Sequence, residues 1–389
     1  MDTAGKVVLQ FHFPHTADGW SSLREKLSGY PSLRMAIETS QGLVVTQLVT
    51  LGLLVFPVNP ASASRYRERQ YPSGTKDDVR DAWALANALR TDGADWTPLA
   101  FDDPLTEELR LLCRDEVGLI GQRTALVNQL QAALLEYFPA LLEAFDDWTV
   151  PAAWKFIQTF PTPQKLAAAG RRKWENFLHA NRMWRPELGP KRLAIFARAS
   201  QLCGSTAQIN AKSRLALSLV AQLQTVHRLL ADYRRQIELL FDRHPDRAIF
   251  DSLPGAGPKL APRLLAEMGD DRVRFPSADR LQCVAGTAPV RYQSGQSDRT
   301  RMRRSCSGSL RTAVHHWCDQ SRHYCAWAQA YYRQHRDKGQ SHACALRCLG
   351  QRWLKILWRM WQNSTPYDET LHTRNQTQHG SWVLHLKPV

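Results

Sequence analysis

Two long stretches of helical periodicity constrain this chain more than any other feature. Residues 105–138 and about 206–241 repeat apolar residues at the spacing of one helical face. They flank a less regular stretch that is rich in tryptophan, with Trp148, Trp154, Trp174 and Trp184. We expect the two helices to pair as an antiparallel helical arm or coiled coil, which more often mediates assembly than chemistry.

The first 60 residues have a different pattern. Short β-rich runs (KVVLQFHF, LRMAIETS and LLVFPVNP) alternate with a helix that opens near Thr16 and another that starts from Gln41. This order predicts β-α-β-α-β, an α/β domain with at least partly parallel strands. A basic loop, SRYRERQYPSGTK, follows, and then a helix whose apolar face is Val79, Ala82, Ala86 and Leu89.

Pro245 interrupts the second long helix, and from Ile249 the chain reads as compact, helical and basic. The fold class expected is therefore α/β plus α. We predict an α/β domain over 1–100, a helical arm over 101–245, a helical C-terminal domain over 246–364, and a loosely ordered polar tail over 365–389.

Charge indicates the class of partner. The chain of 389 residues has 51 Lys and Arg against 36 Asp and Glu, a net charge of +15, as expected of a nucleic-acid-binding protein. The N-terminus does not resemble a signal peptide, and the longest apolar stretch, around 48–58, is too short to span a bilayer. We expect a cytoplasmic protein without a membrane partner. The eight cysteines form no C-x-x-C pair, so neither a zinc ribbon nor a disulfide framework is indicated.

Three carboxylates are candidate metal ligands. Glu38 ends a predicted strand, at the edge where α/β sheets expose functional residues, and Asp78 and Asp81 lie three apart on one helix. Hard oxygen ligands of this kind bind Mg²⁺, which stabilises charge in phosphodiester chemistry. On spacing alone, the alternative that these are ordinary surface acids has the better odds.

The segment DSLPGAGPKLAPRLLAEMG resembles a helix-hairpin-helix. A turn of this kind presents backbone N–H groups and a helix N-terminus to a phosphate, and Lys259 and Arg263 are placed to neutralise it. An ordinary Gly/Pro turn between two helices explains the same residues equally well.

A serine-containing loop rich in arginine follows. Ser294 begins the motif Ser-Gly-x-Ser, and a serine in such a loop attacks a scissile phosphate if cations stabilise the transition state. By itself the motif is weak, because it more often marks a turn that contacts phosphate. The arginines around it are Arg291, Arg299, Arg301, Arg303 and Arg304.

Five motifs in order resemble one known family. They are A-I-E-T-S around Glu38, F-P-V-N-P, K-D-D-V-R-D-A, L-P-G-A-G, and A-G-T-A-P-V-R-Y-Q-S-G-Q-S at 285–297. The resemblance is to the DEDD transposases of the bacterial insertion sequences numbered one-ten, which are bridge-RNA-guided recombinases. It covers about residues 5–361, and the combination of motifs is far more specific than any one of them.

The resemblance implies a RuvC-like N-terminal domain of RNase H fold, a coiled-coil insertion and a C-terminal transposase domain. Glu38, Asp78 and Asp81 then resemble three of the four metal-binding carboxylates, with Mg²⁺ as cofactor. Ser294 resembles the nucleophile that forms a covalent serine–DNA intermediate. The implied partners are element-end and target DNA, a structured guide RNA, and further copies of the chain in a homodimer or homotetramer.

In the family the first aspartate lies on a strand of the type G-I-D-x-A, whereas MDTAGKVV matches the turn after that strand. The resemblance thus implies that Asp2 is a turn residue and that the chain is N-terminally truncated, without the first strand and its aspartate. Two alternatives to a serine recombinase remain open. One is a Holliday-junction-type nuclease that uses only carboxylates and water, and the other is an inactive relative that binds nucleic acid.

Overall fold

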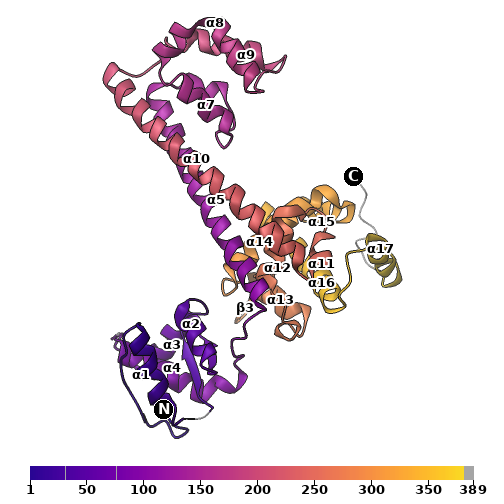
Figure 1. Cartoon of the computed structure of the whole chain (residues 1–389). Helices are drawn as coiled ribbons and strands as arrows, with labels where there is room; N and C mark the ends of the chain where they lie inside the picture. Colours follow the sequence, from indigo (N-terminus) through magenta and orange to yellow (C-terminus); the bar gives the residue numbers. More distant parts are fainter. Residues whose placement is uncertain (31, 76, 381–389) are drawn as a thin grey trace. The chain divides into compact units, whose positions relative to one another are not determined.

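A computed structural model describes residues 1–30, 32–75 and 77–380. The chain divides into two compact units, Met1–Phe101 and the part from Asp102 onward (Figure 1). Lys76, which begins the K-D-D-V-R-D-A motif, lies outside the described residues. None of the described helices is long and apolar enough to cross a membrane.

The first unit is built around two parallel strands. β1 (Arg34–Ile37) pairs with β2 (Leu54–Pro57) in the register Arg34↔Leu54, and the connection between them runs through α2 (Leu43–Thr50). Leu23, Leu48 and Val55 form the centre of the core. The other helices are α1 (Ala17–Leu27), α3 (Pro60–Gln70) and α4 (Asp78–Asp92), whose caps are Thr16, Asn59 and Asp77, followed by a short 3₁₀ turn, Gly93–Asp95.

Three expectations for this unit are wrong. Residues 6–13 form no strand, and Val7, Val8 and Leu9 are exposed, because no described strand pairs with them. Most of the predicted basic loop is helical, since α3 continues to Gln70. The buried face of α4 also differs from the predicted one. Ala84 and Ala88 are buried with Leu89, whereas Val79 and Ala82, which were expected to be buried, are exposed.

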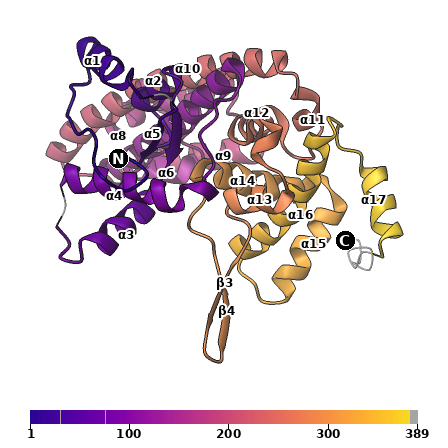
Figure 2. The ribbon, with the colours of Figure 1, turned by 90° about the horizontal axis from the view of Figure 1, so that it is seen from below.

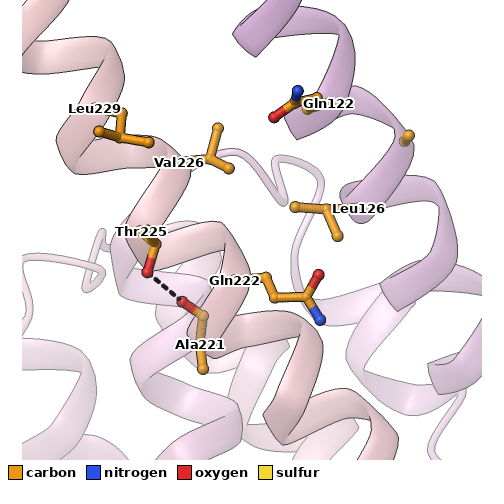
Figure 3. Close-up of a pocket in the computed structure, with 8 residues that line it drawn as sticks. Gln122, Leu126, Ala221, Gln222, Thr225, Val226 and Leu229 are labelled. Carbon is orange, nitrogen blue, oxygen red and sulfur yellow. Dashed lines mark hydrogen bonds between the residues drawn. The ribbon is translucent and has the colours of Figure 1, made fainter.

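The two predicted long helices are present. α5 (Pro104–Tyr137) and α10 (Thr206–Arg243) lie side by side, and their ion pairs show that they run antiparallel (Figure 1). Glu136 at the end of α5 meets Lys212 near the start of α10 at 2.7 Å, and Glu116 meets Arg234 at 2.8 Å. Partway along, their side chains leave an open groove of about 680 Å³, lined by Leu126, Val226 and six other residues (Figure 3).

Short helices follow α5 and precede α10 at one end of this arm: α6 (Ala140–Ala144), α7 (Pro151–Thr159), α8 (Pro163–Ala180) and α9 (Leu188–Arg198) (Figure 1). Phe156 stacks on Phe196 with ring centroids 4.8 Å apart, and Phe145 packs against both. Trp148 and Trp154 are fully buried beside them. The Trp-rich stretch is thus more regular than expected, because its aromatic residues form a core of their own.

The C-terminal body begins at the other end of the arm, and Trp317, Trp353 and Trp361 are buried in its core. Residues 381–389 of the predicted tail lie outside the described residues, but residues 365–380 are more structured than expected: Trp327 Nε1 donates to the Tyr367 hydroxyl at 3.0 Å, and a helix follows. The helices are α11 (Arg247–Asp251), α12 (Gly257–Met268), the 3₁₀ turn Arg272–Arg274, α13 (Ala278–Val284), α14 (Gly308–Tyr324), α15 (Ala326–Asp337), α16 (His342–Gln362) and α17 (Glu369–Gln378).

Candidate functional site

Ser294 lies at the end of a β-hairpin, not in a flexible loop. β3 (Val290–Ser294) and β4 (Ser297–Arg301) are antiparallel, and Ser294 is directly opposite Ser297. Figure 2 shows the hairpin projecting from the C-terminal body. Gly295, at the first central position of the two-residue turn, has φ +56°, which suits glycine and makes the tight reversal. The turn therefore holds the Ser294 hydroxyl near the tip of an exposed ribbon.

The register divides the hairpin side chains between two faces. Directly paired residues share a face, so Ser294 and Ser297 share theirs with the next same-face pair, Tyr292 and Arg299. Arg301 lies on this face too, with its guanidinium 4.3 Å from the centre of the Tyr292 ring. Neither Arg299 nor Arg301 forms an ion pair with another described residue.

On the opposite face of the hairpin, the positive charge of Arg291 is neutralised by an acidic neighbour. Arg291 makes an ion pair with Asp298, and its Nη2 donates to Asp298 Oδ2 at 2.7 Å. The hydrogen bond to Asp298 raises the pKa of Arg291. Arg291 is therefore engaged within the hairpin, so the free positive charge beside Ser294 comes from Arg299 and Arg301.

Polar contacts fix the base of the hairpin. Gln282 Nε2 donates to the Gln351 carbonyl at 2.7 Å, and Gln351 Nε2 donates to the Thr287 carbonyl at 2.7 Å. Arg303 Nε contacts the Ala288 carbonyl at 3.4 Å, while the neighbouring Arg304 is exposed. These bonds tie α13 and α16 to the segment that enters β3. The sequence motif includes Thr287, but no local signal predicted Gln282 or Gln351.

The predicted helix-hairpin-helix turn is packed against α14. Gly255 has φ +74°, and a Cβ there would lie 2.8 Å from the backbone of Gln320 and Ser321. Lys259 is exposed near the start of α12. Arg263 is not: its side chain is 12% exposed and pairs with Glu116 at 2.6 Å. This placement makes Arg263 a structural residue and leaves Lys259 as the accessible cation of the motif.

The three predicted carboxylates lie on adjoining elements of the first unit. Glu38 directly follows β1, while Asp78 and Asp81 lie in the first turn of α4, which packs on β1. Arg67 of α3 donates to Asp81 at 2.8 Å. That hydrogen bond raises the pKa of Arg67, and attraction by Asp81 and Glu38 adds to the effect. Arg67, which sequence reasoning missed, is therefore the counter-ion of this acidic region.

The donor chemistry of these acids suits a hard cation such as Mg²⁺. Within the described part of the chain, however, no three His, Cys, Asp or Glu side chains stand close enough to hold a metal ion. Asp2, the acid nearest the N-terminus, lies in a turn in which Gly5 N bonds to its carbonyl at 3.1 Å, as expected.

Comparison with known proteins decides the family. Residues 1–139 match the DEDD transposase domain of IS110, and residues 247–333 match the domain described as "Transposase IS116/IS110/IS902 family". The chain is 33% identical to the "Mini-circle putative transposase for IS117" of Streptomyces coelicolor, over 95% of this chain and 92% of the relative. The chain belongs to the IS110 family of insertion-element transposases.

Two further relatives extend over most of this transposase. The IS900 uncharacterized 42 kDa protein of Mycobacterium paratuberculosis is 28% identical over 85% of this chain and 83% of its own length. The IS110 uncharacterized 43.6 kDa protein of Streptomyces coelicolor is 25% identical over 95% and 91%. The hairpin with Ser294 lies in the region matched by the second domain, and all three candidate carboxylates lie in the region matched by the first.

Proposed function

We propose that this transposase recombines DNA through a covalent intermediate in which Ser294 is the nucleophile. One observation carries the proposal: the register of the hairpin sets Ser294 on the same exposed face as Arg299 and Arg301, two cations without an acidic partner among the described residues. A hydroxyl attacking a phosphate needs positive charge beside the phosphoryl oxygens, and these arginines supply it.

The proposed step exchanges one phosphoester for another. The Ser294 oxygen forms a bond to phosphorus, and the bond from phosphorus to a deoxyribose oxygen breaks. The proton that serine loses is balanced by the proton that the leaving hydroxyl gains. Lys259, Arg303 and Arg304 are proposed to contact flanking phosphates, while Arg263 and Arg291 serve structural roles because carboxylates engage them.

Glu38, Asp78 and Asp81 are the residues that would hold Mg²⁺. When bound, the ion would stabilise negative charge on the phosphate. In the described arrangement the three acids do not stand close enough to hold a metal ion, and Arg67 neutralises Asp81, so metal binding requires the acids to come together and that pair to open. A RuvC-like fold for the first unit is part of the proposal, supported by the match to DEDD transposases and by the parallel strands.

The proposed partners are the DNA of the element ends and target, a structured guide RNA, and further copies of the chain in a dimer or tetramer, in the cytoplasm. DNA is supported by the family and by the net charge of +15. The RNA and the assembly are supported by the resemblance to RNA-guided recombinases. In such an assembly the carboxylates of one subunit would serve the serine of another.

The test is strand exchange by two matched variants. Ser294→Ala and Ser297→Ala each remove one hydroxyl from the same end of the hairpin face. We expect Ser294→Ala to abolish exchange while DNA binding persists, and Ser297→Ala to remain active. Exchange by Ser294→Ala would contradict the serine mechanism and favour a nuclease that uses metal and water.

A further inference from the structure

The end of the arm carries a concentrated positive charge outside the proposed site. Residues 163–198, which form α8 and α9, contain nine Lys or Arg and two Glu, a net charge of +7. This is nearly half of the net charge of the whole chain, +15, in less than a tenth of its length. Charge this concentrated repels itself and needs an explanation beyond solubility.

Only two of these nine cationic side chains make contacts that stabilise the fold. Arg192 donates to the carbonyls of Ala144 at 2.9 Å and Met183 at 2.6 Å, and Arg198 pairs with Glu143. The other seven side chains are exposed, and none forms an ion pair with another described residue: Lys165, Arg171, Arg172, Lys173, Arg182, Arg185 and Lys191.

Three of the seven occupy an electrostatically unfavourable position. α8 is interrupted at Gly170, whose φ of 74° and ψ of 163° are not helical, so a new helical segment starts at Arg171. Arg171, Arg172 and Lys173 fill its first turn, where the helix dipole disfavours cations. Their positive charges thus destabilise the start of this helical segment. An anion bound there would neutralise them and remove that destabilisation.

The surface around these cations offers no exposed Phe, Tyr or Trp ring to a nucleobase. Trp184 is covered, because it stacks on His179 with ring centroids 4.6 Å apart, and a Cβ at Gly189 would lie 2.6 Å from its ring. Trp174 and Phe196 are buried. No described residue from 151 to 201 is a large apolar side chain that is fully exposed. Single strands are typically bound by stacking their bases, so this surface fits a duplex held by its phosphates.

We propose that the end of the arm binds the backbone of duplex DNA, as a second DNA-binding surface apart from the hairpin. α5 has 34 residues and therefore spans about 50 Å. The arm would thus hold a duplex well away from the C-terminal body. Contacts to phosphates alone are independent of base sequence, so this surface would anchor flanking DNA without selecting a target.

Binding of the full-length protein tests this proposal without any reaction. One variant, Arg171→Gln/Arg172→Gln/Lys173→Gln, removes three charges from the arm end. The matched control, Arg214→Gln/Arg228→Gln/Arg235→Gln, removes three exposed arginines from α10 and gives the same net charge. Affinity is measured over a range of salt concentrations for a DNA duplex, an RNA duplex of the same sequence, and the single DNA strand.

The expected result is a change in salt dependence. For the DNA duplex, the slope of log Kd against log salt should be shallower by about 2.7 in the arm-end variant, because each lost phosphate contact removes about 0.9. The control and Arg171→Lys/Arg172→Lys should keep the wild-type slope. A wild-type slope in the arm-end variant, or a change confined to the RNA duplex or the single strand, would overturn the proposal.

Because this experiment measures binding and no reaction, its outcome is independent of the outcome of the strand-exchange test of the proposed function. Ser294→Ala should bind the duplex with the wild-type slope. Failure of the serine mechanism would therefore not contradict DNA binding by the end of the arm. Failure of that binding would likewise not contradict the serine mechanism.

Discussion

Glu116→Gln tests how the arm is joined to the C-terminal body. Glu116 of α5 is 3% exposed and is held by Arg234 of α10 at 2.8 Å and Arg263 of α12 at 2.6 Å. Burial acts to raise the pKa of Glu116, but the hydrogen bonds from both arginines outweigh it and lower the pKa. The carboxylate is therefore ionised at neutral pH, and the substitution leaves Arg263, itself 12% exposed, without its counter-ion.

Breaking a buried ion pair in this way costs about 3–5 kcal/mol. We expect about 3 kcal/mol, since Arg234 is about one-third exposed and water screens its part of the interaction. For a unit of this size that is a decrease in Tm of about 5 °C. The assay is thermal unfolding at neutral pH, with Glu108→Gln, an exposed acid on the same helix, as the control. A loss below about 1 kcal/mol for Glu116→Gln would refute this account of the junction.

Gly255→Ala should lower the free energy of unfolding by about 2 kcal/mol or more, because the new Cβ would lie 2.8 Å from backbone atoms. In Gly118→Ala the new Cβ meets nothing within 4 Å, so this control should stabilise its helix; chemical denaturation compares the two variants. Burial lowers the pKa of His244, so the unfolded state takes up a proton before the folded state does as the pH falls below about 6.5. The free energy of unfolding should therefore drop between pH 7.5 and 5.5, and it should drop less in His244→Gln. Arg67→Met should tighten Mg²⁺ binding, measured by calorimetry, because Asp81 loses its competing cation; weaker binding would contradict that competition.

Periodicity predicted the elements that are long and locally determined. The helices over 105–138 and 206–241 are present because many turns repeat the same apolar face. The start of α1 was also predicted, since Thr16 favours a helix N-terminus. The run at 6–13 has the composition of a strand, yet a strand needs a partner, and periodicity does not supply one.

Pairing between separate elements explains the remaining differences. The hairpin strands contain charged and hydroxyl side chains and resemble a loop, and only the ladder between them makes them a ribbon. Arg263 resembled a phosphate ligand because its partner, Glu116, lies 147 positions earlier on another helix. Arg67 was read as part of a loop, and its pairing with Asp81 depends on how α3 packs on α4. The ion-pair partners of Arg263 and Arg67 lie on other helices, so the periodicity of one helix does not show them.

Covalent trapping tests the central claim most directly. The purified chain is incubated with element-end DNA, Mg²⁺ and the flanking transcript, denatured, and any protein–DNA adduct is mapped by peptide mass spectrometry. The account predicts an adduct on the peptide that contains Ser294, absent in Ser294→Ala and retained in Ser297→Ala. DNA cleavage without any adduct, or an adduct that persists in Ser294→Ala, would contradict it.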